Sequence, residues 1–575
     1  MDNQDVAHIL DEIGEMLEIK GESSFKVRAY NRAAYAIRGL SEDINNIYHE
    51  GKLQTIPGIG KGIAERIAEL LETGKLTYYE ELCEHVPPGL LQLISIQSVG
   101  PKKAKLFYDK LGITTIEELL EAINKHKLRD LAGMGPKAEE NIRLGILELQ
   151  RLRERILLSE AYPLAENIVQ QLKEHNFILE ISTAGSLRRM KETIGDIDIL
   201  AASNESSKAM DVFCNLPKVT HILAKGETKS SVVTQIGLQV DLRVVLPEQF
   251  GAALQYFTGS KEHNIHLRDI AKKKGLKVNE YGVFEVKTGE KVGGVTEKEV
   301  YNLLGMEWIH PTLRENKGEI EAALAGVLPN IVELSNIKGD IHVHSNWSDG
   351  FNKIKEIAND AKKKGYRYIA ISDHAEKLKV AGGLTADDYR RQWKEIEKVN
   401  QEIDGLKVLR GAEVNIDNNG KVDFDDGFLK EFDIVTASIH SGFTQSNEQL
   451  TKRILSAIYN EHVNIIGHPT GRILGKRPPY PLDLKEIFKA AAETGTFLEL
   501  NSFPDRLDLK DDYLREAKEM GVKFAINTDA HSIGQLRYMF YGVATAQRGW
   551  LEAEDVINTY PFEKLMKMLR NKGNG

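Results

Sequence analysis

The C-terminal part of the chain, from about residue 341, alternates strand-like and helix-like segments. Seven short runs rich in β-branched residues, among them DIHVHS, YIAISDH, DIVTASIH and KFAINTDAHS, are separated by longer amphipathic stretches. Such alternation is typical of βα units that build a parallel sheet. Seven successive units predict a distorted β/α barrel with its helices on the outside.

Histidines and carboxylates follow nearly every one of these strand-like runs. They are His342, His344, Asp349, His374, Glu413, His440, His468, Asp529 and His531. Because the C-terminal ends of the strands converge on one face of a β/α barrel, we expect these nine side chains to meet. Imidazole and carboxylate together suit Zn²⁺, Mn²⁺ or Fe²⁺, so we predict a site for two or three ions that serves phosphoester cleavage. An isolated histidine such as His462 is expected to be structural.

A second set of carboxylates lies in the middle of the chain, among four strand-like runs between residues 179 and 246. Asp196 and Asp198 are two positions apart in DIDILAA, so both point to one face of the strand, and Asp241 lies in LQVDLRVVL. Three acids without a matching base on a buried face are costly unless cations neutralise them. Mg²⁺ or Mn²⁺, held together with substrate phosphates, fits this setting. We predict these three aspartates as the catalytic residues of a two-metal phosphoryl transfer.

The residues before this pair of aspartates offer groups that can hold a polyphosphate. Gly185 and Ser186 form a small-residue turn, and Arg188 and Arg189 follow it. Backbone amides, a hydroxyl and a guanidinium are suitable donors to phosphate oxygens. A bare D-x-D sequence is usually a surface acid pair, but this context favours a nucleotidyltransferase.

A short glycine motif occurs three times in the N-terminal helical part, as TIPGIGKG, IQSVGPKK and AGMGPKAE. Each copy places a tight turn before a new helix, where free backbone N–H groups can hold an anion. We predict that the turns bind DNA phosphates without reading bases, the alternative being ordinary helix connections with glycine caps. The candidate DNA-binding residues of these turns are Gly58, Gly60, Lys61, Gly100, Lys102, Gly133, Gly135 and Lys137, and the middle copy has Ser98 at the first glycine position.

Most of residues 1–318 resemble the family X DNA polymerases, the group of DNA polymerase beta. The segments GSLRRMKETIGDIDIL and QYFTGSKEHNIHLR carry the resemblance, which implies that the three aspartates hold the metal ions. By the same resemblance, the incoming triphosphate contacts Ser186, Arg189 and Gly195; the sugar contacts Tyr256, Phe257 and Gly259; and the nascent base pair and template contact Asn264 and Arg268.

The resemblance also bears on the DNA 5′ end, where Lys26, Tyr30 and Lys61 match positions that hold a 5′-phosphate. Arg66 stands where the family's repair members have the lysine nucleophile of a deoxyribose-phosphate lyase. Because a guanidinium stays protonated, we expect no lyase activity of that type. Gln239 replaces an arginine near the third aspartate, a change that concerns control of the primer end.

The C-terminal motifs H-x-H, S-D-H and D-A-H resemble the PHP (polymerase and histidinol phosphatase) family, and all nine ligand positions match. The whole chain is therefore similar to bacterial or archaeal family X DNA polymerases with a C-terminal PHP domain. That resemblance implies a polymerase that fills short gaps in DNA repair and a metal-dependent 3′→5′ exonuclease, with abasic-site endonuclease and 3′-phosphatase activities known in the family.

The expected architecture is multidomain α/β. Its parts are a helical DNA-end-binding domain with a helix-hairpin-helix motif (1–85), a helical DNA-binding subdomain with further such motifs (86–155), a nucleotidyltransferase palm of mixed sheet and helices (156–248), a thumb-like nucleotide-selecting subdomain (249–318), a linker (319–337) and the PHP phosphoesterase barrel (338–575).

Composition limits the partners that we expect. The net charge is −9, so DNA must be held by local basic patches, backbone amides or metal ions. Two cysteines exclude a disulfide framework and suit the cytoplasm, and the chain shows neither a secretory signal nor a membrane-spanning run. We expect a cytoplasmic monomer that acts on gapped or primer–template DNA with dNTPs. Two alternatives stay open: a PHP phosphatase tethered to DNA, and a non-catalytic DNA-end scaffold.

Overall fold

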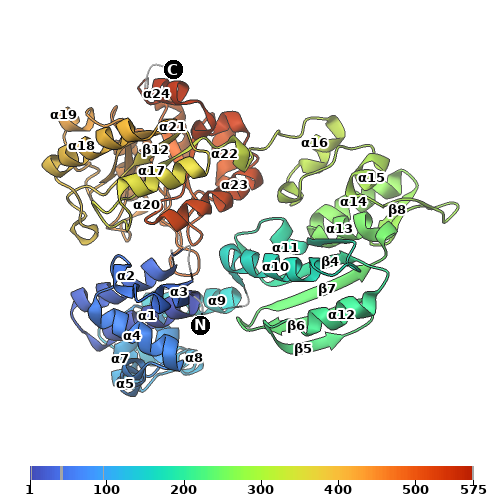
Figure 1. The fold of residues 1–575 in the computed structure, drawn as a ribbon, viewed down its shortest axis with the longest axis horizontal. Coiled ribbons are helices and arrows are strands. Elements are labelled where there is room, and N and C mark those ends of the chain that lie inside the picture. Colours follow the sequence, from blue (N-terminus) through green and yellow to red (C-terminus); the bar gives the residue numbers. More distant parts are fainter. Residues whose placement is uncertain are drawn as a thin grey trace.

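The computed structural model describes residues 1–575 with a few gaps. The residues outside the description are Asp2, Gly39, Ser41, Glu42, Ser95, Gln97, Glu154, Asn571 and residues 573–575. Figure 1 shows three regions: N-terminal helices, a central α/β part that extends to one side, and the C-terminal barrel. Among the described residues, none of the helices is both long and apolar enough to cross a membrane.

The N-terminal region is all helical. Its elements are α1 (Asn3–Lys20), α2 (Ser24–Arg38), α3 (Ile44–His49), η1 (Leu53–Thr55), α4 (Lys61–Thr73), α5 (Thr77–His85), α6 (Gly89–Ile94), α7 (Pro101–Leu111), α8 (Ile116–Asn124), η2 (Lys127–Asp130) and α9 (Pro136–Arg153). One buried hydrophobic core runs from Val6 to Ile146, so the first two parts of the expected architecture pack as a continuous unit. Helix α9 leads from it to the central region (Figure 1).

The central region begins with a mixed sheet. Its elements are β1 (Ile156–Leu157), α10 (Leu158–Lys173), β2 (Glu180–Thr183), α11 (Gly185–Arg188), β3 (Thr193–Ile194), β4 (Asp196–Ala202), α12 (Ser206–Cys214), β5 (Val219–Lys225), β6 (Lys229–Thr234) and β7 (Gln239–Val245). The five-stranded order is β2-β4-β7-β6-β5, in which β4 and β7 are parallel and the other pairs antiparallel. Strand β5 was not among the predicted strands, because it is an edge strand whose side chains are mostly exposed and show no apolar alternation.

The thumb-like part follows with its own core. Its elements are η3 (Pro247–Gln249), α13 (Phe250–Thr258), α14 (Lys261–Lys273), β8 (Leu276–Asn279), β9 (Gly282–Glu285), β10 (Lys291–Gly293), α15 (Glu297–Leu303), η4 (Pro311–Leu313) and α16 (Glu319–Ala325). Buried Glu297 accepts two hydrogen bonds from Arg188 and one from buried Arg314, all at 2.7 Å. This ion cluster joins the thumb-like part to the turn that precedes β4.

The C-terminal region is the predicted barrel. Strands β11 (Gly339–Val343), β12 (Tyr368–Ile371), β13 (Lys407–Asn415), β14 (Ile434–Ser438), β15 (Ile465–Ile466), β16 (Phe497–Asn501) and β17 (Phe524–Asn527) pair in chain order, all parallel. A parallel bridge between Val343 and Ala530, with a 2.8 Å hydrogen bond from the His344 N–H to the Ala530 carbonyl, brings the last strand back to the first. All seven predicted strands are confirmed.

Helices surround the barrel and close one end of it. The larger ones are α17 (Ile354–Lys363), α18 (Ala386–Glu402), α20 (Asn447–Ile458), α21 (Leu484–Thr494), α22 (Asp511–Glu519), α23 (Met539–Arg548) and α24 (Phe562–Arg570). Apolar side chains of α24 share a buried cluster with residues near the N-terminal ends of the strands. The opposite end, where the strands finish, therefore stays available for a site.

The barrel also packs against the central region. Arg472 donates to Glu192 at 2.8 Å, and Arg548 donates to the Arg189 carbonyl at 2.8 Å and to Glu315 at 3.0 Å. The predicted triphosphate-binding turn is thus in direct contact with the last barrel helices.

Candidate active sites

The three predicted carboxylates of the palm lie together on neighbouring strands. Asp198 in β4 is the register partner of Asp241 in β7, and Asp196 faces Gln239. Because β4 and β7 run parallel, paired residues point to the same face. Gly185 has φ of +58°, and a Cβ there would lie 2.3 Å from Oδ2 of Asp198, so only glycine allows this turn to approach the carboxylate.

The electrostatics of this group favour a cation. Burial, and then the charges of Asp196 and Asp241, raise the pKa of Asp198 from 3.8 to about 6. Burial also acts to raise the pKa of Asp241, but hydrogen bonds from Lys229, Gln239 and Ser231 outweigh it and the pKa is lowered. A divalent cation would offset the desolvation and the repulsion between carboxylates that raise the pKa of Asp198.

The expectation that the acids have no matching base is wrong. Lys229, at the start of β6, places Nζ 2.6 Å from Oδ2 of Asp241, and the Gln239 amide donates to Oδ1 at 2.9 Å. The reason is tertiary: β6 pairs with β7, so the lysine reaches the acid across the sheet. One lysine does not balance three carboxylates, and the group keeps its need for a cation.

The predicted triphosphate and sugar positions come from two segments that touch each other. Arg189 donates from Nη1 to the Thr258 carbonyl at 2.6 Å and from Nε to Glu315 at 3.0 Å. Gly259 has φ of +72°, and a Cβ there would lie 3.1 Å from Nη1 of Arg189. Ser186 and Gly195 lie on either side of this turn, in α11 and immediately before β4. The structure thus joins the two segments to each other, with Gly185 of the first beside Asp198, and their contacts with a nucleotide stay a prediction.

The other predicted nucleotide contacts differ in accessibility. The rings of Tyr256 and Phe257 meet edge to face at 5.1 Å, and the Arg243 guanidinium lies 4.4 Å from the centre of Phe257. Asn264 is buried, accepts from Gln255 at 2.8 Å and donates to the Tyr256 carbonyl at 2.7 Å, whereas Arg268 is exposed. Asn264 therefore already fixes the turn at the end of α13, and its role toward a base pair stays a prediction.

The three glycine turns have the same conformation. Gly58, Ser98 and Gly133 all take positive φ, of +86°, +72° and +80°. In each turn the backbone N–H of the following residue donates a hydrogen bond to the carbonyl three residues before it. The donors are Ile59, Val99 and Met134, and the distances are 3.1, 2.9 and 3.0 Å. Sequence similarity among the copies therefore reflects a repeated structure, with the middle serine strained into a glycine-like geometry.

The second glycine of each turn is informative because the protein itself does not require it. Gly60 and Gly100 have ordinary extended φ of −78° and −92°, and a Cβ at either position, or at Gly135, would meet nothing within 4 Å. A missing side chain in open space is useful when an external backbone approaches closely. Lys61, Lys102 and Lys137 are exposed beside these turns.

The predicted 5′-phosphate residues form part of an aromatic–cation cluster. The Arg66 guanidinium donates to the Tyr30 hydroxyl and lies 3.7 Å from the ring centre of Tyr78, and Lys26 Nζ lies 5.6 Å from the same ring. Tyr78 was missed by the sequence analysis, since a tyrosine at the start of a helix carries no signal of its own. Lys61 lies in α4, the same helix as Arg66.

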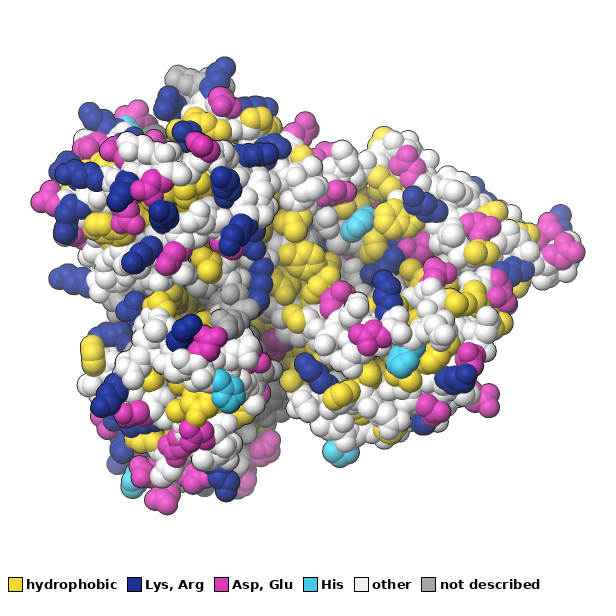
Figure 2. All heavy atoms as spheres, in the orientation of Figure 1, with side chains coloured by type: hydrophobic (Ala, Val, Ile, Leu, Met, Phe, Trp, Pro, Cys, Tyr) yellow, Lys and Arg dark blue, Asp and Glu magenta, His cyan; other side chains and the backbone are white. Residues whose placement is uncertain are grey.

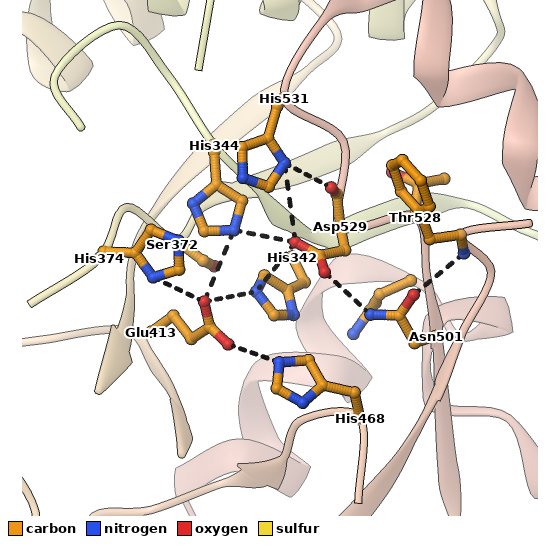
Figure 3. Close-up of polar contacts among 12 residues, drawn as sticks. His342, His344, Ser372, His374, Glu413, His468, Asn501, Thr528, Asp529 and His531 are labelled. Atoms are coloured by element: carbon orange, nitrogen blue, oxygen red, sulfur yellow. Dashed lines mark hydrogen bonds and ion pairs between the residues drawn. The ribbon is translucent and has the colours of Figure 1, made fainter. Parts of the chain in front are cut away.

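The nine predicted ligands of the barrel lie together at the C-terminal ends of the strands. Figure 3 labels seven of them: His342, His344, His374, Glu413, His468, Asp529 and His531. Their side-chain atoms form three overlapping groups: His344, Asp349, His374 and His531; His342, His344 and Asp529; and His374, Glu413 and His440. The ninth, His468, places Nε2 3.1 Å from Oε1 of Glu413. Because His344 and His374 each belong to two groups, the arrangement suits several ions side by side.

Several of these groups lack a partner that a cation would supply. Nε2 of His342 and Nδ1 of His344 are buried without a hydrogen-bond partner. Burial lowers the pKa of His342, but the carboxylates of Glu499 and Glu413 outweigh burial and raise it well above its ordinary value. The raised pKa means that the carboxylates favour a positive charge at this site, which a proton on His342 supplies when no metal ion is bound. The donor set of imidazoles and carboxylates fits metal ions.

A second set of residues orients the ligands. Glu499 lies 2.7 Å from Nδ1 of His342, and its other oxygen accepts from the His468 N–H at 2.7 Å. Asn415 contacts Nδ1 of His440 at 2.7 Å. Carboxylates and amides behind ligand histidines fix the tautomer and ring position. Glu499 was missed by the sequence analysis because it lies in the middle of β16, two residues before Asn501 ends the strand, whereas most of the predicted ligands lie at or just after strand ends.

The fold and these two sites define an enzyme class with a nucleotidyltransferase palm and a barrel metallophosphoesterase on one chain. Models of known families match as a helix-hairpin-helix domain (1–76), a SAM-like helix-hairpin-helix tandem (90–147), a DNA polymerase beta thumb (253–315) and a PHP domain (340–503).

Curated relatives agree with this division. The DNA polymerase/3′-5′ exonuclease PolX of Bacillus subtilis (strain 168) is 40% identical over 572 residues, which cover 99% of this chain and all of the relative. DNA polymerase lambda of Rattus norvegicus is 26% identical over 54% of this chain and 56% of its own length. A probable phosphatase of Thermoanaerobacter sp. (strain X514) is 36% identical over 33% of this chain and 78% of its own length. The chain belongs to the family X DNA polymerases that carry helix-hairpin-helix, thumb and PHP domains.

Proposed function

We propose that this protein is a DNA polymerase that fills short gaps during DNA repair and that removes 3′-terminal nucleotides at its barrel site. The single observation that carries the proposal is the presence of both sites in one chain: paired Asp198 and Asp241 in the palm, and the imidazole–carboxylate cluster in the barrel. A relative whose name states both activities, PolX of Bacillus subtilis, supports it.

In the palm, Asp196, Asp198 and Asp241 would hold Mg²⁺ or Mn²⁺. Ions bound there supply positive charge that stabilises the attacking and leaving oxygens of phosphoryl transfer. The chain's own contribution is position: the turn at Gly185 brings its backbone close to Asp198, and the Thr258 carbonyl holds the Arg189 guanidinium at the end of α13. Tyr256 and Phe257 would form the wall that the sugar meets.

In the barrel, the nine ligands would hold two or three Zn²⁺, Mn²⁺ or Fe²⁺ ions. Such ions supply a nucleophile from water near neutral pH and stabilise charge on the phosphate. The protein fixes the ligands through Glu499 and Asn415 and surrounds them with buried strand ends. Water reaches the site from the side where Asp349 and His531 are partly exposed.

The partner is gapped or primer–template DNA, with dNTPs as the second substrate. Figure 2 shows basic and acidic side chains interspersed on the visible face. An overall positive electrostatic potential on this face therefore does not explain DNA binding. The three glycine turns with their exposed lysines supply local phosphate contacts. We also propose that the protein acts as a monomer in the cytoplasm. Cys83 and Cys214 are both free thiols, which suits a reducing compartment.

Two substitutions separate the activities. With a one-nucleotide-gapped DNA and dNTPs, Asp198→Ala should abolish primer extension and leave degradation of a 3′ end intact, because it removes a palm carboxylate only. His344→Ala should do the reverse, because His344 belongs to two of the three ligand groups. Extension and degradation are read on the same gel with Mg²⁺ or Mn²⁺.

The matched control is His462→Ala, a partly buried barrel histidine away from the cluster, which should change neither activity. Retention of extension by Asp198→Ala would contradict the palm assignment, and retention of degradation by His344→Ala would contradict the barrel assignment. A DNA-end scaffold without chemistry predicts binding to the gap and no product in any sample.

A 3′-phosphatase activity is a second candidate for the barrel. Similarity of this region to probable phosphatases favours it. Release of inorganic phosphate from a 3′-phosphorylated primer, abolished in His344→Ala, would support it. Hydrolysis of small phosphomonoesters without any action on DNA would instead favour a phosphatase tethered to DNA.

A further inference from the structure

A pocket of about 800 Å³ lies between the N-terminal helices and the barrel site. One wall is helix α2, and the other includes the ligands Asp349, Asp529 and His531. Figure 1 shows α2 on the side of the N-terminal region that faces the barrel. A volume of this size accommodates a nucleotide.

Helix α2 has two functional faces. Val27, Tyr30 and Ile37 are buried in the N-terminal core. Residues at helical spacing on another face, Phe25, Arg28, Arg32 and Tyr35 among them, line the pocket. On this second face Ala29 and Tyr35 also pack against the N-terminal core, whereas Phe25, Arg28 and Arg32 are exposed and available to something in the pocket.

Tyr35 attaches this face to the metal site. Its hydroxyl donates to Oε1 of Gln535 at 3.1 Å, and the same oxygen accepts from the His531 N–H at 2.7 Å. The Tyr35 ring stacks on Phe503 at 6.1 Å and meets the His531 ring edge-on at 5.6 Å. The position of α2 is therefore set by a residue adjacent to a metal ligand, and the pocket is part of the site.

The other lining groups suit one strand of nucleic acid. The charged side chains are Arg28, Arg32, Lys379 and Arg506 against Asp349, Asp505 and Asp529, and two of these acids belong to the metal-ligand groups. Nη1 of Arg506 is buried without a hydrogen-bond partner, and Phe25 is 77% exposed at the pocket rim. The Arg506 guanidinium, whose Nε lies 4.0 Å from Oδ2 of Asp529, keeps Nη1 for a phosphate, and an exposed aromatic ring suits a base.

We propose that helix α2 and the barrel together form the binding pocket for the terminal nucleotide of the strand that the nuclease degrades. Arg32 and Arg506 contact its phosphates, and Phe25 stacks on a base. Gly58 of the first glycine turn also lines the pocket, so a strand held by that turn leads to the metal site. The inference rests on the proposed nuclease activity and adds that the N-terminal region supplies the DNA selectivity of the barrel.

The test uses the full-length protein with a 5′-labelled thymidine trinucleotide, which is too short to span the other glycine turns. Arg32→Ala and Phe25→Ala should each raise KM for its degradation by about 5- to 100-fold, the range for loss of one stacking or phosphate contact, and should leave kcat within about twofold. Hydrolysis of bis(p-nitrophenyl) phosphate, which reports on the metal centre alone, should not change. Arg32→Lys should recover part of the loss.

Matched controls come from the same helical region. Lys110→Ala and Tyr108→Ala remove an exposed cation and an exposed aromatic ring from α7, outside the pocket, and should leave KM unchanged. Melting temperatures of all variants establish that they fold.

Binding of the trinucleotide in EDTA, followed by fluorescence anisotropy, tests the pocket without nuclease chemistry. Weaker binding in Arg32→Ala and Phe25→Ala than in the α7 controls is expected. Equal KM and equal binding in wild type and both α2 variants would overturn the inference. Absence of any hydrolysis by the wild type, with the binding difference intact, would contradict the nuclease and leave the pocket supported.

Discussion

Asp198→Asn offers the sharpest test of the palm electrostatics. The pKa of Asp198 is about 6 in the folded protein against an ordinary value of 3.8. At about 1.4 kcal/mol per pH unit, ionised Asp198 costs the metal-free fold about 3 kcal/mol. Asparagine has nearly the same shape and carries no charge, so the variant should have a more stable sheet around β4 and β7 in EDTA.

The pH dependence follows from the raised pKa. Below 3.8 the aspartate is protonated in both states and no penalty exists; the penalty grows between 3.8 and about 6 and is complete above 6. Stability of the wild type therefore falls as pH rises through this window. The advantage of the variant should be largest at pH 8, about half as large at pH 5, and smaller still toward pH 4.

Hydrogen–deuterium exchange by mass spectrometry measures this locally, which suits a protein with several cores. A full 3 kcal/mol would slow exchange of β4 and β7 peptides about 100-fold, and water around exposed Asp196 reduces it, so we expect about 10- to 100-fold at pH 8. Mg²⁺ should slow exchange in the wild type and have little effect in the variant.

Asp211→Asn, which neutralises an exposed acid of the same region, is the matched control and should leave the exchange unchanged. Barrel peptides from β13 provide an internal reference. Equal exchange in wild type and Asp198→Asn at pH 8 would refute the reasoning, as would a difference that is the same at pH 8 and pH 5.

Three further predictions concern other parts of the molecule. Glu499→Gln should weaken Mn²⁺ binding about 10- to 100-fold by calorimetric titration, because Glu499 orients His342, and unchanged affinity would count against that role. Arg548→Ala should cost about 3–5 kcal/mol and lower the melting temperature, since it removes the guanidinium that pairs with buried Asp511 at 2.6 Å; an unaltered melting curve would be inconsistent with this. Ser98→Gly should stabilise the protein by up to about 1 kcal/mol in urea unfolding, because serine is strained at φ of +72°; a loss of stability would contradict it.

Local patterns predicted much of the fold. The barrel strands were found because parallel strands are buried on both faces and read as continuous apolar runs. Four of the five strands of the palm sheet were found, and the fifth was missed because β5 is an exposed edge strand. The side chains of the two predicted ligand sets lie together as expected, because a period of two places Asp196 and Asp198, or His342 and His344, on one face.

Other parts of the sites depend on contacts that no local pattern encodes. Lys229 reaches Asp241 only because β6 pairs with β7. Glu499 lies behind His342 only because β16 and β11 belong to the same barrel. In both cases the residue type is ordinary, and its partner is set by how the strands assemble.

The sequence by itself predicted where the two candidate reaction centres lie, because residue types that suit cations recur at strand ends and in strand periodicity. Only the tertiary structure decided how the parts of the chain combine at those centres. Tyr35 and Gln535 are 500 positions apart and share a hydrogen bond beside His531, a predicted metal ligand. The chemistry of a side chain follows from the residue type alone. The contact between α2 and the barrel depends on two surfaces that exist only after each region has folded.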